Sequence, residues 1–187
     1  MATLSEIRSR LASKLGNDQV IDPTSAQIDQ AINYTIDYYE TDTFWFNQDV
    51  AELTATAGNR VLSTGMPADF KQEVQIDGLT VVYNQVWTPL RHITPLQYDS
   101  LNAEQQGLPI AYIYRDGNFE LFPYPDQAYT IRLFYIKSYS DLATDGGSND
   151  FTNYATRLIE YKTLIDLLLD YRCDSERALT YQAFLQS

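Results

Sequence analysis

The sequence predicts an α+β fold, in which helices from the two ends of the chain form an α-helical bundle and the middle forms an inserted antiparallel β-rich subdomain. Apolar residues recur with helical spacing near both ends of the 187-residue chain. Between these regions, apolar and polar residues alternate with the period of two that is typical of strands. Helices at the two ends can pack together only if the β region is an insertion between them.

On this basis we divide the chain into four segments of one composite domain. A chain of this length fits one domain, or one core that carries an inserted subdomain. The segments are the N-terminal helices at 1–48, the β-rich insertion at 49–137, a flexible loop at 138–152 and the C-terminal helices at 153–187.

The N-terminal segment contains two helices that begin with the same signal. Thr3 with Glu6, and Thr24 with Gln27, predict capping boxes, in which each side chain satisfies an unpaired amide at the helix start. Gly16 is expected to end the first helix. The predicted apolar faces are Leu4, Ile7, Leu11 and Leu15 in the first helix, and Ile28, Ala31, Ile32, Ile36 and Tyr39 in the second.

An aromatic cluster, Phe44, Trp45 and Phe46, lies where the second helix fades, at about 41–46. Aromatic side chains of this size are usually buried for most of their area. We therefore expect a corner of the core here rather than a platform for a ligand.

The β-rich insertion is predicted to contain several strands and one short helix. In the first strand Ala51, Leu53 and Ala55 alternate with polar residues, and after a turn at 58–59 the chain returns as the next strand. Thr94 is expected to cap a short helix at 96–106, with a proline in its first turn and a glycine at its end. The predicted strands are 49–56, 60–63, 70–76, 79–87, 110–114, 119–122 and 129–136.

The stretch YIYRDGNFELFPYPD, at 112–126, is predicted to form a β-hairpin. Asp116–Gly117 is a strong hairpin signal, because a type I′ turn needs positive φ at both central residues. Tyr112 and Tyr114 share one face, directed either into the core or toward a neighbouring subunit. Of the carboxylates, Asp116 then belongs to the turn, Glu120 to a strand face and Asp126 to the turn after two prolines.

The end of the chain is predicted to be helical again after a polar loop at 138–150. The strongest helix is expected at 153–172, and Asp174 is expected to cap a last helix with Ala178, Tyr181 and Leu185 on one side. The apolar face of the strongest helix is Leu158, Ile159, Tyr161, Leu164, Ile165, Leu168 and Leu169.

Charge and composition exclude several classes of function. The formal net charge of −12 disfavours sequence-driven binding to nucleic acid or to an anionic membrane. The 15 tyrosines suit half-buried sheets and protein interfaces. With one cysteine an internal disulfide is impossible, and the sequence shows neither an apolar run long enough to span a membrane nor a signal peptide. We expect synthesis in a reducing cytoplasm.

No catalytic, cofactor-binding or metal-binding residue is predicted, and we expect no enzyme. The segment 145–150 has oxygens that suit calcium but lacks the ligand spacing of an EF-hand. His92 is accompanied by no nucleophile elbow, and Cys173 ends a helix, where the dipole disfavours a thiolate. Glu120 with Asp126 is the best pair for a glycosidase, but the hairpin gives both structural roles.

Several short blocks follow one another along the chain, between flanking pairs of helices. They are WTPL at 87–90, GLPIAY at 107–112, DG at 116–117, LFPYP at 121–125, YTIRLFY at 129–135 and DSERALTY at 174–181. In this order they resemble the head–tail adaptor proteins, also called head completion or connector proteins, of short-tailed and related tailed bacteriophages. The resemblance covers nearly the whole chain.

The resemblance implies a structural virion protein at the head–tail interface, made in the host bacterial cytoplasm. Such adaptors form a homo-oligomeric, usually dodecameric, ring that binds beneath the portal protein, extends the DNA channel and forms the platform for tail proteins (nozzle, tube or fibre). Double-stranded DNA would pass without sequence-specific binding, and an acidic channel wall suits this because it offers few phosphate contacts. No membrane is implied. The terminal helices are candidates for portal or neighbour contacts, and 138–150 and the β region for neighbour or tail contacts.

Two other functions remain open from the sequence. A carbohydrate-binding or carbohydrate-cleaving module would use the tyrosines with Trp45 and Trp87, because aromatic rings stack on sugars. A general interaction domain of a cellular protein would have the same composition.

Overall fold

The computed structural model describes residues 2–16, 23–62, 65–74, 78–101 and 104–185. The chain divides into two compact units, which we call the helical unit (Met1–Asp42 with Tyr139–Ser187) and the β unit (Thr43–Ser138). Helices and antiparallel sheets are both present, so the predicted α+β class is confirmed.

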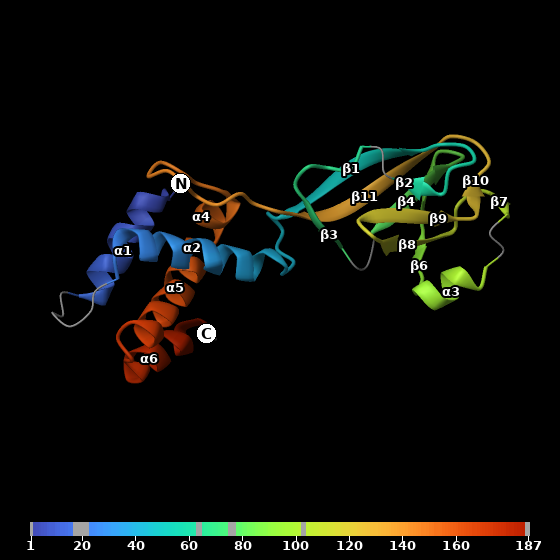
Figure 1. Ribbon diagram of the computed structural model, residues 1–187. Coiled ribbons are helices and arrows are strands. Elements are labelled where there is room, and N and C mark those ends of the chain that lie inside the picture. Colours follow the sequence, from blue (N-terminus) through green and yellow to red (C-terminus); the bar gives the residue numbers. More distant parts are fainter. Residues whose placement is uncertain (1, 17–22, 63–64, 75–77, 102–103, 186–187) are drawn as a thin grey trace. The chain divides into compact units, whose positions relative to one another are not determined.

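The helical unit is arranged around one long helix near the end of the chain. This helix, α5, contacts each of the other helices in the unit (Figure 1). None of the described helices is long and apolar enough to cross a membrane. The helices are α1 (Leu4–Leu15), α2 (Ser25–Glu40), α4 (Asp150–Tyr154), α5 (Thr156–Asp170) and α6 (Ser175–Leu185).

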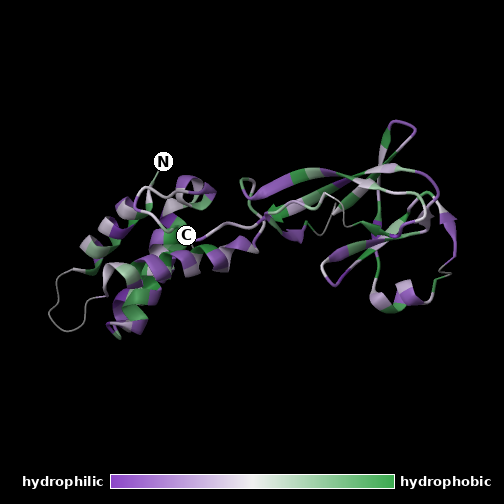
Figure 2. Ribbon diagram, turned by 45° about the horizontal axis from the view of Figure 1, so that its top comes forward, coloured by the Kyte–Doolittle hydropathy of each residue, from purple (hydrophilic) through white to green (hydrophobic). Residues whose placement is uncertain are grey.

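Local sequence signals explain where these helices begin. The capping boxes of Thr3 with Glu6 and of Thr24 with Gln27 are present, as predicted. Asp174 accepts a hydrogen bond from the amide of Arg177 at 3.0 Å, which confirms the predicted cap of α6. In Figure 2 the helices carry hydrophobic stretches on one side and hydrophilic stretches on the other, as the burial of one face requires.

Burial within the helical unit follows the predicted helical periodicity closely. The predicted face of α1 is fully buried, and α2 and α5 also bury a polar pair, in which the Thr163 hydroxyl donates to Thr35 at 2.9 Å. Leu169 was expected on the buried face of α5 but is 45% exposed, and Leu167 is buried instead.

The strongest predicted helix, 153–172, is in fact two helices with a break at Ala155. Asn149 caps α4 through a hydrogen bond from the Thr152 amide at 3.0 Å, so helix begins inside the segment 138–152 that was predicted as loop. Phe151 is fully buried in α4 and holds this extra turn in place.

The remainder of the loop between the units is bound to the start of α1. The amides of Leu4 and Ser5 donate to the carbonyl oxygens of Gly147 and Asp145, at 2.9 and 3.1 Å. These amides belong to the first turn of α1. Amides in the first turn of a helix have no acceptor within the helix itself. The start of α1 and a loop about 140 positions further along the chain are therefore joined through backbone hydrogen bonds.

The β unit consists of two main sheets and a short two-stranded pair. In the first sheet β11 is central, with β1 along one edge and β4 and β3 along the other. The second sheet has the order β2-β9-β8-β6. The strands are β1 (Gln48–Ala55), β2 (Val61–Leu62), β3 (Phe70–Glu73), β4 (Leu79–Tyr83), β5 (Val86–Pro89), β6 (Arg91–His92), β7 (Gln106–Gly107), β8 (Ala111–Arg115), β9 (Asn118–Phe122), β10 (Tyr124–Pro125) and β11 (Tyr129–Lys137).

Side chains from both sheets form one shared core. Alternate residues of β11 are buried, as its period-two pattern predicts. The opposite face of β8 and β9 packs against the short helix α3 (Pro95–Asp99), so these strands are covered on both sides. The shared core contains Leu53, Leu62, Leu79, Val81, Leu90, Tyr112, Phe119, Leu121, Ile131 and Leu133 among others.

Two predictions of strand pairing need correction. The strand predicted at 60–63 does not return along β1: Val61 lies opposite Glu120, so β2 pairs with β9 in the other sheet. Two short pairings, β6 with β8 and β7 with β10, are parallel, although an antiparallel region was predicted. In both corrections, the strand pairing is set by partner strands that are distant in the sequence.

Two predictions of element length also need correction. The strand predicted at 79–87 is the hairpin β4–β5, because Asn84 and Gln85 adopt positive φ values of 49° and 64° and turn the chain. The helix predicted at 96–106 stops at Asp99, where the Ser100 hydroxyl donates to the Gln97 carbonyl at 2.7 Å. Part of the strand predicted at 70–76 lies outside the described residues.

The hairpin predicted at 112–126 is present, and its turn has the predicted chemistry. Asp116 and Gly117 adopt positive φ values of 52° and 78°, as a type I′ turn requires. The tyrosine face points into the core at Tyr112, which is 2% exposed, whereas Tyr114 near the turn is 40% exposed. The tyrosine face of β8 is therefore buried at Tyr112 and partly exposed to solvent at Tyr114.

Candidate interaction surfaces

The titratable groups that the sequence offered for nucleophilic catalysis lie at the surface. His92 is exposed on β6, with its Nε2 atom 3.8 Å from Glu73 Oε1 and its ring 5.2 Å from that of Tyr112. Cys173 is exposed after the end of α5, with a positive φ of 51°. His92 belongs to the β unit and Cys173 to the helical unit.

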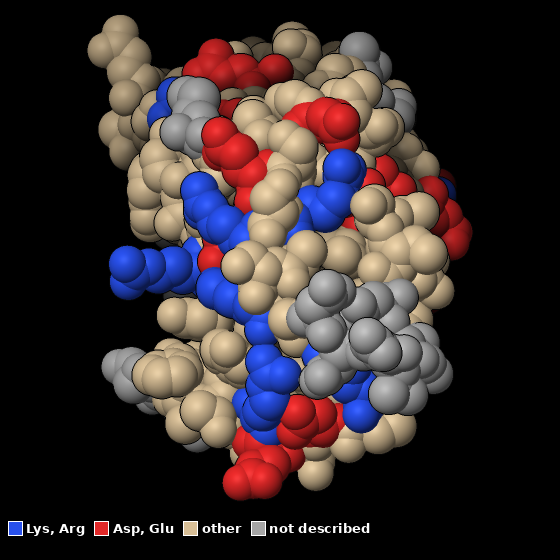
Figure 3. All heavy atoms as spheres, turned by 90° about the vertical axis from the view of Figure 1, so that its left-hand side faces the viewer, with Lys and Arg blue, Asp and Glu red and all other residues tan. Residues whose placement is uncertain are grey.

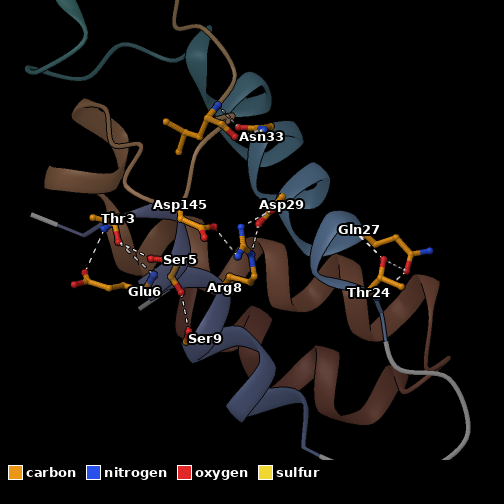
Figure 4. A network of polar contacts seen from close by, with 11 residues as sticks. Thr3, Ser5, Glu6, Arg8, Ser9, Thr24, Gln27, Asp29, Asn33 and Asp145 are labelled. Atoms are coloured by element: carbon orange, nitrogen blue, oxygen red, sulfur yellow. Dashed lines mark hydrogen bonds and ion pairs between the residues drawn. The ribbon is translucent and has the colours of Figure 1, made fainter.

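The oxygens of the segment 145–150 are engaged by protein partners, which argues for a structural role. Asp145 forms an ion pair with Arg8 at 2.9 Å, and Asp150 accepts a hydrogen bond from the Tyr139 hydroxyl at 2.9 Å. Figure 4 shows Arg8 between Asp29 and Asp145, joining α1, α2 and this loop. Among the described residues, no group of three or more His, Cys, Asp or Glu side chains is arranged to hold a metal ion.

Glu120 and Asp126, the best glycosidase pair in the sequence, have separate partners. Glu120 accepts hydrogen bonds from Arg115 at 3.1 and 3.2 Å, and Arg60 lies 3.8 Å away. Asp126 accepts a hydrogen bond from the Tyr129 hydroxyl at 2.7 Å. Both carboxylates therefore stabilise the hairpin region, in line with their predicted structural roles.

The two tryptophans of the carbohydrate alternative are arranged differently from each other. The guanidinium of Arg132 lies 3.7 Å from the centroid of the Trp87 ring and covers one of its faces. Trp45 is 73% exposed, so the predicted core corner is wrong for this residue, although Phe46 beside it is buried. The rings of Phe44 and Phe46 stack at 5.1 Å. Nothing in this arrangement favours a sugar site.

A basic and aromatic surface covers the helical unit where α1, α5 and α6 meet. Glu160 is nearly buried between α5 and α1 and binds Arg10 at 3.0 Å and Lys14 at 2.7 Å. The Arg177 guanidinium donates to the Lys14 carbonyl at 2.9 Å, which brings α6 to the same place. In Figure 3 Lys and Arg side chains gather in a column on this side of the molecule.

Aromatic rings complete this surface, which we call the basic face. The Lys14 ammonium lies 5.0 Å from the centroid of the Tyr161 ring, and that ring contacts Tyr181 and Phe184 at 6.0 and 5.9 Å. Arg157 is exposed one helical turn before Tyr161 on α5. The basic face consists of Arg10, Lys14, Arg157, Tyr161, Arg177, Tyr181 and Phe184.

A second surface of the helical unit is acidic and follows α2. Tyr34 is 65% exposed between two hollows: one of about 460 Å³ against the loop at 141–143, and one of about 180 Å³ against α5. Aspartates line both hollows, and Tyr38 is exposed next to them. We call this surface the acidic face; it consists of Asp29, Tyr34, Asp37, Tyr38, Asp141, Asp166 and Asp170. Two cations lie within it: Lys162 pairs with Asp166 at 2.6 Å and lies 5.2 Å from the centroid of the Tyr38 ring, and Arg8 pairs with Asp29 at 2.6 Å.

Tyrosines in the β unit, in contrast, are tied to carboxylates in the interior. Burial raises the pKa of Tyr112, and the hydrogen bond that its hydroxyl donates to Glu73 raises it further. Burial, with the Asp69 carboxylate, likewise raises the pKa of Tyr135. Burial and the nearby Glu120 raise the pKa of Tyr98 to about 12. These hydroxyls remain protonated in the folded protein well above the pKa of an exposed tyrosine, near 10.

The free energy of unfolding of the β unit is therefore expected to fall as the pH rises above about 10. The unfolded chain releases these protons first, so the stabilisation is complete below pH ~10 and is lost as the pH rises through the higher folded pKa values, near 12 for Tyr98. Urea unfolding followed by tryptophan fluorescence between pH 8 and about 11.5 tests this. Tyr98→Phe should make the decline shallower; a constant stability over this range would contradict the assignment.

The sites and surfaces together define a class of protein. The candidate catalytic carboxylates hold structural positions, whereas large aromatic and charged side chains are displayed on the helical unit. This organisation is typical of a structural interaction protein.

The comparison with protein families identifies the family. The model of the SU10 adaptor protein family matches residues 2–187, and the chain belongs to this family. It is accordingly a phage head–tail adaptor, a structural component of the virion. A search among curated proteins found no match.

Proposed function

We propose that the chain forms a homo-oligomeric, dodecameric ring that binds beneath the phage portal protein, extends the DNA channel and forms the platform for tail proteins. The family match over residues 2–187 carries this proposal, because it covers both units. The chain is made in the host bacterial cytoplasm and assembles at the head–tail interface.

The surface chemistry supports this function. Subunits of a ring need side-to-side interfaces in which two different patches meet, and exposed tyrosines such as Tyr34 and Tyr38 suit such interfaces. A net charge of −12 gives the ring few contacts for phosphates, so double-stranded DNA passes without being held. A channel wall lined mainly by Lys and Arg would contradict this second point.

The decisive experiment mixes the purified protein with the portal protein of the same phage and images the product by electron microscopy. We expect a twelvefold ring seated on the portal, and addition of tail proteins should extend the particle on the side away from the portal. A chain that stays monomeric and never associates with the portal would refute the proposed function.

A further inference from the structure

The basic and acidic faces of the helical unit are complementary to each other. The basic face carries Arg157, which is exposed and has no ion-pair partner among the described residues. The acidic face carries Asp141 and Asp170, which are also exposed and, in the same described part of the chain, have no ion-pair partner. We propose that, in the ring proposed above, the basic face of one copy docks on the acidic face of the next copy.

The two faces point in different directions, as a ring requires. Arg157 and Asp166 are nine residues apart on α5, which is about two and a half helical turns, so they lie on opposite sides of this helix. A copy can therefore contact one neighbour through its basic face and another through its acidic face. Interfaces of this head-to-tail kind generate rings when the rotation between copies closes.

Charge also disfavours the alternative in which identical faces meet. A symmetric dimer through the basic face would bring Arg157 of two copies together, and one through the acidic face would bring pairs of aspartates together. Like charges placed opposite each other in an interface are strongly unfavourable. The charges on the helical unit thus select the head-to-tail arrangement.

The aromatic side chains indicate a protein partner for the basic face rather than DNA. Phe184 is 56% exposed and contacts Tyr161 and Tyr181, so a large part of this face is apolar. The outside of a DNA duplex presents phosphates, which offer nothing to these rings, whereas Tyr34 and Tyr38 on the acidic face are exposed aromatic side chains that can pack against them. Aromatic residues buried at the centre of an interface commonly supply most of its binding energy.

The test reverses the charge of each face separately. Arg157→Glu makes the basic face acidic, and Asp141→Lys with Asp170→Lys makes the acidic face basic. Each variant alone should assemble at least about tenfold less well than the unaltered protein, by sedimentation velocity and by counting rings on the portal. In an equimolar mixture both kinds of contact become complementary again, so rings should return to within about threefold of the normal yield.

Controls separate this inference from loss of folding and from the proposed function. The altered residues are exposed, so circular dichroism and thermal unfolding should match those of the unaltered protein. Arg91→Glu makes the same charge change on an exposed residue of the β unit and should leave assembly unchanged.

Four outcomes would overturn the proposal. Normal rings from both charge-reversed variants would place the neighbour contact elsewhere and leave the proposed function standing. A mixture of the two variants that fails to form rings would have the same meaning. Normal rings from Arg157→Glu that no longer retain DNA would assign the basic face to nucleic acid. Failure of the unaltered protein to form rings with the portal would refute the ring itself, and with it this interface.

Discussion

Replacing Phe119 with alanine is expected to lower the free energy of unfolding of the β unit by about 3–5 kcal/mol. Phe119 is 0% exposed, and its ring lies 4.8–5.9 Å from those of Tyr114, Phe70 and Tyr112. Side chains from two sheets surround it, so the backbone around the cavity cannot collapse without breaking strand pairs. Denaturant unfolding followed by tryptophan fluorescence reports the effect, because Trp45 and Trp87 both belong to the β unit.

Phe151 provides a matched comparison in the other unit. It is also 0% exposed, but it belongs to α4 of the helical unit. Phe151→Ala should shift the unfolding transition seen by helical circular dichroism at 222 nm and leave the fluorescence transition almost unchanged. Loss of less than about 1 kcal/mol in Phe119→Ala would contradict the described core, and equal shifts of both probes in each variant would show that the units unfold together.

Replacing Gly78 with alanine is expected to cost about 2–4 kcal/mol, although it adds one methyl group. A Cβ atom at this buried position would lie 2.5 Å from the Tyr112 hydroxyl oxygen, 2.6 Å from Glu73 Oε2 and 3.3 Å from the Val74 carbonyl. The methyl group would therefore separate Tyr112 from Glu73 and leave a partly buried carboxylate without its hydrogen bond. Urea unfolding at neutral pH, again followed by tryptophan fluorescence, measures the loss.

Two further variants test whether the clash with the Tyr112 hydroxyl causes the loss of stability in Gly78→Ala. Gly146→Ala adds the same methyl group in the helical unit, at a position with no atom within 4 Å, and should change the stability followed by circular dichroism at 222 nm by less than about 0.5 kcal/mol. Tyr112→Phe removes the hydroxyl that the methyl group would meet. Gly78→Ala should therefore cost less in the Tyr112→Phe background than in the unaltered protein; equal costs in both backgrounds would show that the clash lies elsewhere.

The elements that the sequence predicted well depend on local interactions. A capping box joins residues three positions apart, as in Thr3 with Glu6, and a type I′ turn is set by its two central residues, here Asp116 and Gly117. The helical periodicity of α1 is likewise a property of a few adjacent turns. These predictions were confirmed because the interactions that stabilise each feature lie within the quoted segment.

The errors lie where the deciding partner is distant or the local signal is weak. The strand after Gly58 pairs with β9 because Val61 meets Glu120, a residue 59 positions further along the chain. The hairpin at 84–85 was missed because Asn84 and Gln85 adopt positive φ without the glycine that usually marks such a turn. Trp45 was expected to be buried on the basis of its type alone, and only its surroundings show that it is exposed.

The candidate interaction surfaces could not be predicted from the sequence. Arg10 and Lys14 are linked to Glu160, about 150 positions away, only when α1 packs on α5. The total charge of −12 conceals the basic face, because its Lys and Arg side chains, which are far apart in the sequence, gather only in the folded helical unit. The net charge of a chain governs its solubility and its long-range electrostatic attraction or repulsion, but it does not say which charged groups meet at a surface.

The sequence by itself therefore determined the α+β class, the starts of α1, α2 and α6, the turn at 116–117 and, through the order of its blocks, the adaptor family. The tertiary structure alone decided the strand partners, the inward position of Tyr112 and the two oppositely charged faces. The physical reason is the same for each. Caps, turns and periodicity arise from residues that are close along the chain, whereas pairing, burial and surface charge arise from residues that only folding brings together.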